Sequence, residues 1–287
     1  MTGFEKAWLD SVRREVYALA RSTSPGADSW RRLKSALLAA ANCVRQEAGE
    51  NSAPIGLTRI KELRQIRREL LFRGDDAPDA ILIPVAGGFT LNLRADQPKV
   101  RRRFSTAHEI AHTFFYDTDK SPPARIISQD ASTSLSPKEE DVCSAFAREL
   151  LLPAELVRPE TLALTPSNAL EAVSRLAKQY EVSTEVVTRR LMSDWARLEA
   201  SIAVFWEVVG EEDGRAVRSR WYKGRAVRRY LRRSEEEVFK RILEIVDTGP
   251  PYTALDEAKA RYESCASIQW SASRSSPRFV ALLNFHR

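Results

Sequence analysis

Apolar residues recur every three or four positions along the first quarter of the chain, a spacing typical of amphipathic helices that bury one face. This pattern predicts helices over residues 4–20, 28–47 and 57–72. Gly74 and Pro78 then interrupt the pattern. Between residues 80 and 95 the period changes to two, and a Gly87-Gly88 turn signal divides the segment. We therefore expect a β-hairpin or two adjacent strands there.

The middle of the chain is mainly helical in pattern, and its last third favours strands. Helices are predicted over residues 100–116, 138–152, 168–180 and 184–197, and a Ser-, Pro- and Asp-rich loop over 119–137. Beyond residue 200, strands are predicted over 202–206, 215–222 and 265–285, interleaved with helices over 234–246 and 254–263. The pattern predicts an α+β protein with an N-terminal helical segment (1–54), a mainly helical domain with a small sheet (55–160), a helix-turn-helix-like segment (161–198) and a C-terminal α+β domain (199–287).

The composition is that of a soluble globular protein, with 43% hydrophobic and 29% charged residues. No apolar run approaches the roughly 20 residues that a membrane helix needs. The first 20 residues lack the features of a secretory signal, and three widely spaced cysteines do not indicate a disulfide framework. These features predict a cytoplasmic protein with no membrane partner. The net charge of +6 is too mild an excess to identify a partner.

The most informative segment is the helix predicted over residues 100–116, because it contains the motif His-Glu-x-x-His. His108 and His112 are four residues apart, so both imidazoles lie on one helix face and can share a metal ion. Glu109 lies beside that face and can take a proton from a water molecule activated by the metal. The chain has only three histidines, so this motif should arise by chance in roughly a few per thousand such chains.

A hydrolytic zinc site usually takes three protein ligands, so a third must come from elsewhere in the chain. His286 is a poor candidate, because it is the penultimate residue of the other predicted domain. The helix over residues 138–152 is a better source, since Glu140 lies at the edge of its apolar face. Spacing alone leaves Glu139, Asp141 and Cys143 open as rivals, and a charged first turn that complements the helix dipole is the plainer interpretation of the acids.

A resemblance to a known family bears on this choice. The segment Arg-Phe-Ser-Thr-Ala-His-Glu-Ile-Ala-His (103–112), followed by Glu140-x-x-Cys143-Ser144-x-Phe146-Ala147-x-Glu149-Leu150-Leu151-x-Pro153, resembles the ImmA/IrrE family of metallopeptidases. The family's second motif usually reads Glu-x-x-Ala-Asn-x-Phe-Ala, and its glutamate is the third metal ligand, which corresponds to Glu140. Cys143 and Ser144 depart from that pattern, so the hydrogen bonds around the ligands are expected to differ. The resemblance covers about residues 55–195.

The resemblance implies a zincin-like peptidase fold, a zinc ion and a regulatory function. Members of the family resemble proteases that cleave a helix-turn-helix repressor in stress or mobile-element responses. A site with two histidines and one carboxylate also accepts manganese or iron. The alternating segment 89–95 could pair with an extended substrate as an edge strand, but an internal strand is an equally good interpretation of the pattern.

Two other segments suggest nucleic-acid binding. Residues 172–192 resemble a helix-turn-helix, in which Thr188, Arg189 and Arg190 could face a groove, although structural packing is the favoured interpretation. Residues 215–233 hold nine basic residues and no acid, with aromatic residues between them, a composition that suits single-stranded nucleic acid. The candidate contacts there are Arg218, Arg220, Trp221, Lys223, Arg225, Arg228 and Arg229. A solvated face above core aromatics is the alternative.

The leading hypothesis is therefore a regulatory zinc endopeptidase. The alternatives are a catalytically silent nucleic-acid-binding or sensory regulator built on the same fold, and a metal-dependent hydrolase that acts on a substrate other than a peptide. The presence of Glu109 favours an enzyme, because only catalysis needs that carboxylate.

Overall fold

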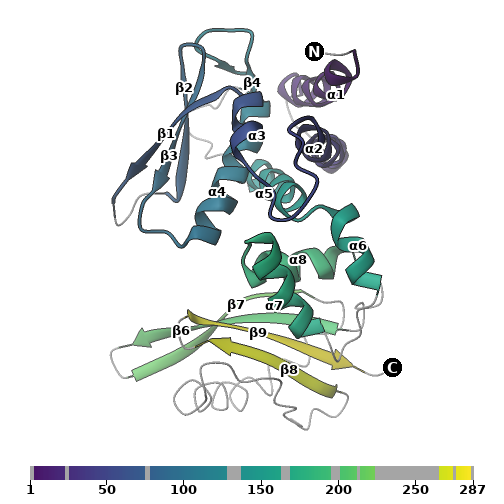
Figure 1. Cartoon of the computed structure of the whole chain (residues 1–287), viewed down its shortest axis with the longest axis vertical. Coiled ribbons are helices and arrows are strands. Elements are labelled where there is room, and N and C mark those ends of the chain that lie inside the picture. The colour runs from purple at the N-terminus through teal and green to yellow at the C-terminus, as the bar shows by residue number, and fades with distance from the viewer. Residues whose placement is uncertain are drawn as a thin grey trace. The chain divides into compact units, whose positions relative to one another are not determined.

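The computed structural model describes residues 3–22, 26–74, 78–127, 137–162, 169–194, 201–211, 214–223, 265–273 and 276–285 (Figure 1). By its internal contacts the chain divides into two compact units. The first contains residues 1–156 and 179–182, and the second contains residues 157–178 and 183–287. The finer boundaries predicted at residues 54, 160 and 198 remain a prediction. Among the described residues, no helix combines the length and apolarity that crossing a bilayer requires.

The first unit begins with two long helices, α1 (Gly3–Ala20) and α2 (Ala27–Glu47), as the apolar spacing predicts. The apolar stripe of α2 is fully buried, because α2 packs against α1 on one side and α5 (Pro137–Leu151) on the other. Its buried residues are Leu33, Leu37, Ala40, Ala41 and Val44. Polar contacts tie the same helices together, since the Asn42 amide donates to Glu149 of α5 at 3.2 Å.

The helix predicted over residues 57–72 is wrong. The structure has a short helix α3 (Thr58–Leu63) and then a strand β1 (Ile66–Phe72). Gln65 has a φ of 58°, which ends the helix and turns the chain. Apolar residues of 57–72 fit the helical period, but β1 pairs in parallel with β3 (Gly88–Arg94), about 20 residues further along. A local sequence pattern contains no information about such a distant partner strand.

The hairpin predicted over residues 80–95 is present as β2 (Ala80–Val85) and β3, which pair antiparallel around Gly87 and Gly88. The strand order is β1-β3-β2, so β3 is the central strand. Of the two interpretations of residues 89–95, the edge strand is wrong and the internal strand is correct. β3 is central because it pairs with β1 on one side and with β2 on the other, and its Phe89, Leu91 and Leu93 are buried in the core.

One long helix and three short elements follow the sheet and lead to α5, the second long helix of the site. They are α4 (Lys99–His112), the 3-10 turn η1 (Thr113–Phe115), and the strands β4 (Tyr116–Asp117) and β5 (Ala124–Arg125), which form a small hairpin. Figure 1 shows α4 between the sheet and the helices α5, α2 and α1, and α4 contacts β2, β3 and α5. The predicted helix over 138–152 is α5, and Pro153 separates it from α6 (Ala154–Leu162).

The second unit contains α7 (Ala169–Tyr180), whose last two residues belong to the first unit, and α8 (Thr184–Asp194). Four antiparallel strands follow in the order β7-β6-β9-β8. They are β6 (Ser201–Glu211), β7 (Gly214–Lys223), β8 (Cys265–Ser273) and β9 (Ser276–Phe285). The helices predicted over 234–246 and 254–263 lie outside the described residues. The predicted α+β class is confirmed.

Candidate metal centre

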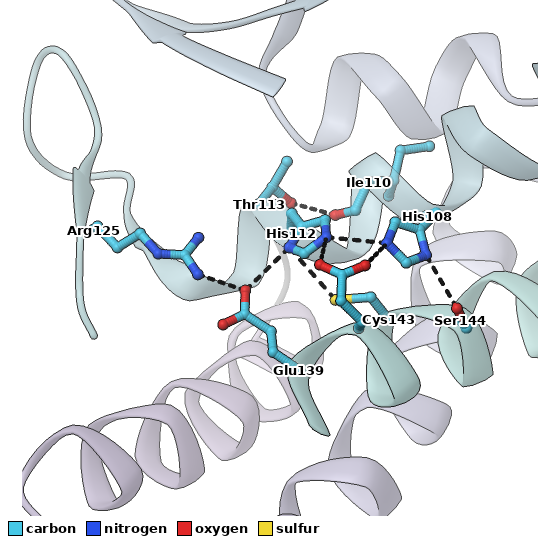
Figure 2. Close-up of polar contacts among 9 residues, drawn as sticks. His108, Ile110, His112, Thr113, Arg125, Glu139, Cys143 and Ser144 are labelled. Atoms are coloured by element: carbon cyan, nitrogen blue, oxygen red, sulfur yellow. Dashed lines mark hydrogen bonds and ion pairs between the residues drawn. The ribbon is translucent and has the colours of Figure 1, made fainter. Parts of the chain in front are cut away.

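The His-Glu-x-x-His segment lies at the end of α4, where the helix is held between the sheet and α5. Its apolar residues Ala107, Ile110 and Ala111 are fully buried, which fixes the rotation of the helix. Beyond His112, Thr113 Oγ1 donates to the Ile110 carbonyl at 2.6 Å and accepts from Arg64 at 2.9 Å. Figure 2 shows Thr113 and Ile110 beside the two histidines. The end of the helix that carries the motif is therefore anchored by the surrounding protein.

His108 and His112 point toward each other from successive turns of α4 (Figure 2). Their Nε2 atoms are 3.1 Å apart, and the ring centroids are 4.9 Å apart. Glu140, from the first turn of α5, completes the group. Its carboxylate lies 2.9 Å from His108 Nε2 and 3.4 Å from His112 Nε2. The structure thus brings together the three residues that the sequence analysis named as metal ligands, and their ligand atoms all lie within 4.8 Å of one another.

These three residues fit a zinc ion. Zinc–ligand bonds of 2.0–2.1 Å in tetrahedral geometry place neighbouring ligand atoms about 3.3 Å apart. The two Nε2 atoms are 3.1 Å apart, and each faces its own Glu140 oxygen, Oε2 at 2.9 Å from His108 and Oε1 at 3.4 Å from His112, so the spacing is close to that value. Two imidazoles and one carboxylate are also the donor set of hydrolytic zinc sites with one coordination position left for the reaction. Hydrogen bonds with His108 and His112 hold the pKa of Glu140 well below its ordinary value, so its carboxylate is ionised at neutral pH.

Glu139, the neighbouring residue of Glu140, contacts the opposite side of the His112 ring. Its side chain is 3% exposed and lies 3.1 Å from His112 Nδ1, while Arg125 donates to the same carboxylate oxygen at 2.5 Å. An ionised carboxylate only accepts hydrogen bonds, so this contact places the proton on Nδ1 and directs the Nε2 lone pair toward Glu140. Glu139 is therefore positioned to orient a ligand, whereas Asp141 is exposed and lies near Lys34.

Cys143 and Ser144, the two departures from the family pattern, also lie against the histidines (Figure 2). The Cys143 sulfur is 3.6 Å from His112 Nδ1, and Ser144 Oγ is 3.3 Å from His108 Nδ1. Burial raises the pKa of the Cys143 thiol to about 11, so the thiolate needed for zinc binding is scarce at neutral pH. Both side chains approach the Nδ1 atoms, away from the point where the Nε2 atoms converge.

Glu109 adjoins this group on the side of strand β2. Burial raises the pKa of its carboxyl group, and the neighbouring His112 and His108, together with a hydrogen bond from the Leu82 backbone, offset part of that effect. The Leu82 contact identifies the edge of the sheet that faces the site. Asp79 O bonds to Arg94 N, so odd-numbered residues of β2 bond to β3 and even-numbered residues direct their backbone groups outward.

The segments proposed for nucleic acid are only partly described. Arg218, Arg220, Trp221 and Lys223 lie on β7, an edge strand of the second sheet, and the backbone of Arg218 lies opposite that of Glu207 in β6. Arg225, Arg228 and Arg229 lie outside the described residues, as does His286. In the helix-turn-helix-like segment, Thr188 and Arg190 are buried at 1% and 9% exposure, and Arg189 pairs with Glu185. The idea that Thr188 and Arg190 face a groove is therefore wrong, because both contribute to packing.

Comparison with known proteins identifies the domain that holds this group. Residues 75–192 match the peptidase M78 family, described as the IrrE N-terminal-like domain. This part of the chain is an IrrE N-terminal-like domain. The predicted resemblance is thus confirmed, and with it the zincin-like fold of the domain. No curated protein gives a significant match to the sequence.

A solved structure shares the fold of the chain. It is a Mycobacterium tuberculosis transcriptional regulator, with a TM-score of 0.54 and 14% sequence identity. The match covers 97% of this chain and 81% of that one. At this identity the likeness concerns the fold.

Sequence reasoning named the three residues that the structure brings together, but it missed two contacts around them. Arg125 lies in the segment predicted as a loop, and no spacing connects it to the motif. The hydrogen bond between Leu82 and Glu109 depends on the register of β2, which the alternating pattern does not specify. From the sequence, Glu139 was considered only as a rival ligand. In the structure, Glu139 contacts Nδ1 of His112 and the next residue, Glu140, faces Nε2 of the same ring, an arrangement that the sequence does not reveal.

Proposed function

We propose that this chain is a zinc-dependent regulatory endopeptidase that cleaves a helix-turn-helix transcriptional repressor. The observation that carries the proposal is the convergence of His108 Nε2, His112 Nε2 and the Glu140 carboxylate beside the half-buried carboxylate of Glu109. A bound zinc ion supplies a Lewis acid that polarises the scissile carbonyl group and lowers the pKa of water.

Glu109 is the catalytic residue in this proposal. It takes a proton from the attacking water as the carbon–oxygen bond forms, and it delivers that proton to the amine nitrogen as the peptide bond breaks. Burial supports this role, because a carboxyl group with a raised pKa is a stronger base than an exposed one. The Leu82 backbone fixes the carboxylate, since it donates a hydrogen bond from the adjacent strand.

The open edge of β2 is the proposed binding surface for the substrate backbone. Residues 80, 82 and 84 direct backbone groups away from β3, on the side where Leu82 reaches Glu109. An extended peptide can add to such an edge by main-chain hydrogen bonds. Pro84 has no N–H, and the Leu82 N–H is already donated to Glu109, so this edge offers a substrate mainly its carbonyl groups. The edge that we propose for the substrate is thus β2, in place of the segment 89–95.

The repressor as substrate is supported by the ImmA/IrrE-family domain and by the fold shared with a protein described as a transcriptional regulator. The test is co-expression of the chain with the helix-turn-helix repressor encoded beside it, with Glu109→Gln as the matched variant. Cleavage by the wild type and not by Glu109→Gln, with equal zinc content in both proteins, supports the proposal. Intact repressor with both proteins, together with binding of single-stranded DNA, favours a silent nucleic-acid-binding regulator instead.

A further inference from the structure

Three elements, α4, β5 and α5, each supply one member of a polar chain that ends at a proposed metal ligand. His112 ends α4, Arg125 ends β5, and Glu139 lies in the first turn of α5. Arg125 Nη2 donates to Glu139 Oε1 at 2.5 Å, and the same oxygen lies 3.1 Å from His112 Nδ1. Figure 2 shows this line from Arg125 through Glu139 to His112. One carboxylate oxygen therefore connects the guanidinium group to the imidazole ring.

The ion pair between Arg125 and Glu139 compensates the charge of a buried carboxylate. Glu139 is 3% exposed, and an unpaired carboxylate at such a position is costly because water cannot solvate it. Arg125 is the cationic side chain that pairs with Glu139 among the described residues. Without the guanidinium group, no lysine or arginine among the described residues would pair with the Glu139 carboxylate and hold it against His112 Nδ1.

Arg125 is itself held in place by the β4–β5 hairpin. The backbone of Arg125 lies opposite that of Tyr116 in the hairpin, and the next residue, Ile126, donates its N–H to the Phe115 carbonyl at 2.9 Å. The guanidinium carbon lies 5.2 Å from the Tyr116 ring centroid and 5.8 Å from that of Phe115. These contacts restrict the arginine to one region above the rings. The hairpin therefore presents a fixed cation to the start of α5.

We propose that Arg125 is a positioning residue that orients His112 for zinc through Glu139. The inference rests on the proposed zinc function, because it assigns Arg125 a part in holding the metal. Cys143 also approaches His112 Nδ1, at 3.6 Å, but a neutral sulfur is a weak acceptor. Glu139, held by Arg125, keeps the Nδ1 proton on its side of the ring and leaves Nε2 directed at His108 and Glu140. Partners of this type strengthen metal binding about 10- to 100-fold.

The experiment measures zinc affinity of the full chain by competition with a chromophoric chelator. The variants are Arg125→Ala, Arg125→Lys and Glu139→Gln, and the matched control is Arg13→Ala. Arg13 anchors the turn of the same hairpin, through Thr118 and Asp119, but contacts no member of the proposed site. Thermal unfolding of the metal-free proteins reports whether a variant has lost its fold, a change that orientation of His112 alone does not produce.

Arg125→Ala is expected to bind zinc about 10- to 100-fold more weakly than the wild type. Arg125→Lys should recover part of this loss, because a lysine keeps the charge but not the planar donor group. Adding Arg125→Ala to Glu139→Gln should cause little further loss, since both changes break the same chain of contacts. Arg13→Ala should bind zinc as the wild type does.

Two results would overturn the inference while leaving the proposed function intact. One is wild-type zinc affinity in both Arg125→Ala and Arg125→Lys. The other is an equal loss in Arg13→Ala, which would trace the effect to the hairpin and not to the ion pair. A wild-type protein that binds no zinc would instead overturn the proposed function. If Arg125→Ala fails to fold, Arg125→Lys and Glu139→Gln still decide the question.

Discussion

The two histidines of the proposed metal centre lie in different surroundings, although they are one helical turn apart. The side chain of His112 is 8% exposed and contacts an ion-paired carboxylate, and that of His108 is 15% exposed and contacts the neutral hydroxyl group of Ser144. The buried side of the site is thus oriented by charge, and the other side by a weaker neutral contact. The comparison suggests that the two sides contribute unequally to metal binding, which the following changes can test.

The largest effect is expected at Glu109, which lies beside both histidines and accepts a hydrogen bond from the Leu82 backbone. Glu109→Gln should lower kcat for repressor cleavage by about 100- to 10,000-fold, because the amide cannot accept the proton from water. Zinc content measured by mass spectrometry should remain at one ion per chain in this variant. A Glu109→Gln protein that cleaves at the wild-type rate would exclude this residue as the base.

Removal of a ligand should weaken zinc binding more than the 10- to 100-fold typical of changes around the ligands, thus by more than about 100-fold. This is expected for His108→Ala, His112→Ala and Glu140→Ala. The histidines should differ in stability, since loss of the buried His112 ring leaves the Glu139–Arg125 pair facing a cavity. Metal-free His112→Ala should therefore unfold at a lower temperature than metal-free His108→Ala. Equal unfolding temperatures would contradict the distinction between the two sides.

A smaller effect is expected for the residues that orient the two rings. Glu139→Gln should weaken zinc binding by about 10-fold or more, and Ser144→Ala by less than about 10-fold, because a hydrogen bond to a charged group is roughly twice as strong as a neutral one. The chelator competition assay measures both losses directly. If Ser144→Ala has the larger effect, the His108 side of the site contributes more to zinc affinity than the His112 side, contrary to our expectation.

The smallest effect is expected at Cys143. Its thiol pKa of about 11 lies above the ordinary value of 9.0, so the reactive thiolate stays scarce until the pH approaches 11. In a protein with Cys43 and Cys265 changed to Ser, the remaining thiol should react with a disulfide reagent at pH 7 only after denaturation. Cys143→Ala should bind zinc almost as the wild type does. Rapid labelling of the native protein would show that this side chain is not buried.

The approach of the two histidine rings could be predicted from the sequence, because it follows from helix geometry. A separation of four positions between His108 and His112 places both rings on one helix face, whatever surrounds the helix. Glu140 followed from a resemblance, and its spacing alone left three rivals. Arg125 could not be predicted, because its contact depends on a hairpin of two-residue strands that brings it back to α5.

The fold was predicted where local patterns decide it and missed where distant partners do. The helices α1, α2, α4 and α5 agree with their apolar spacing to within a few residues. Residues 66–72 satisfy the helical period equally well, yet they form β1 because β3 supplies backbone partners in parallel. The position of β3 at the centre of its sheet is likewise a property of three strands together, and no single strand reveals it.

The packing of α2 has a consequence for anyone who wishes to shorten the protein. The residues that match the family begin at 75. The match therefore excludes α2, although α2 packs against α5. A fragment limited to residues 75–192 would lack α2, and α5 would lose this packing partner together with the hydrogen bond from Asn42 to Glu149. Such a fragment would contain all the proposed ligands, but we expect it to aggregate, because helices that support the site lie outside the residues that match the family.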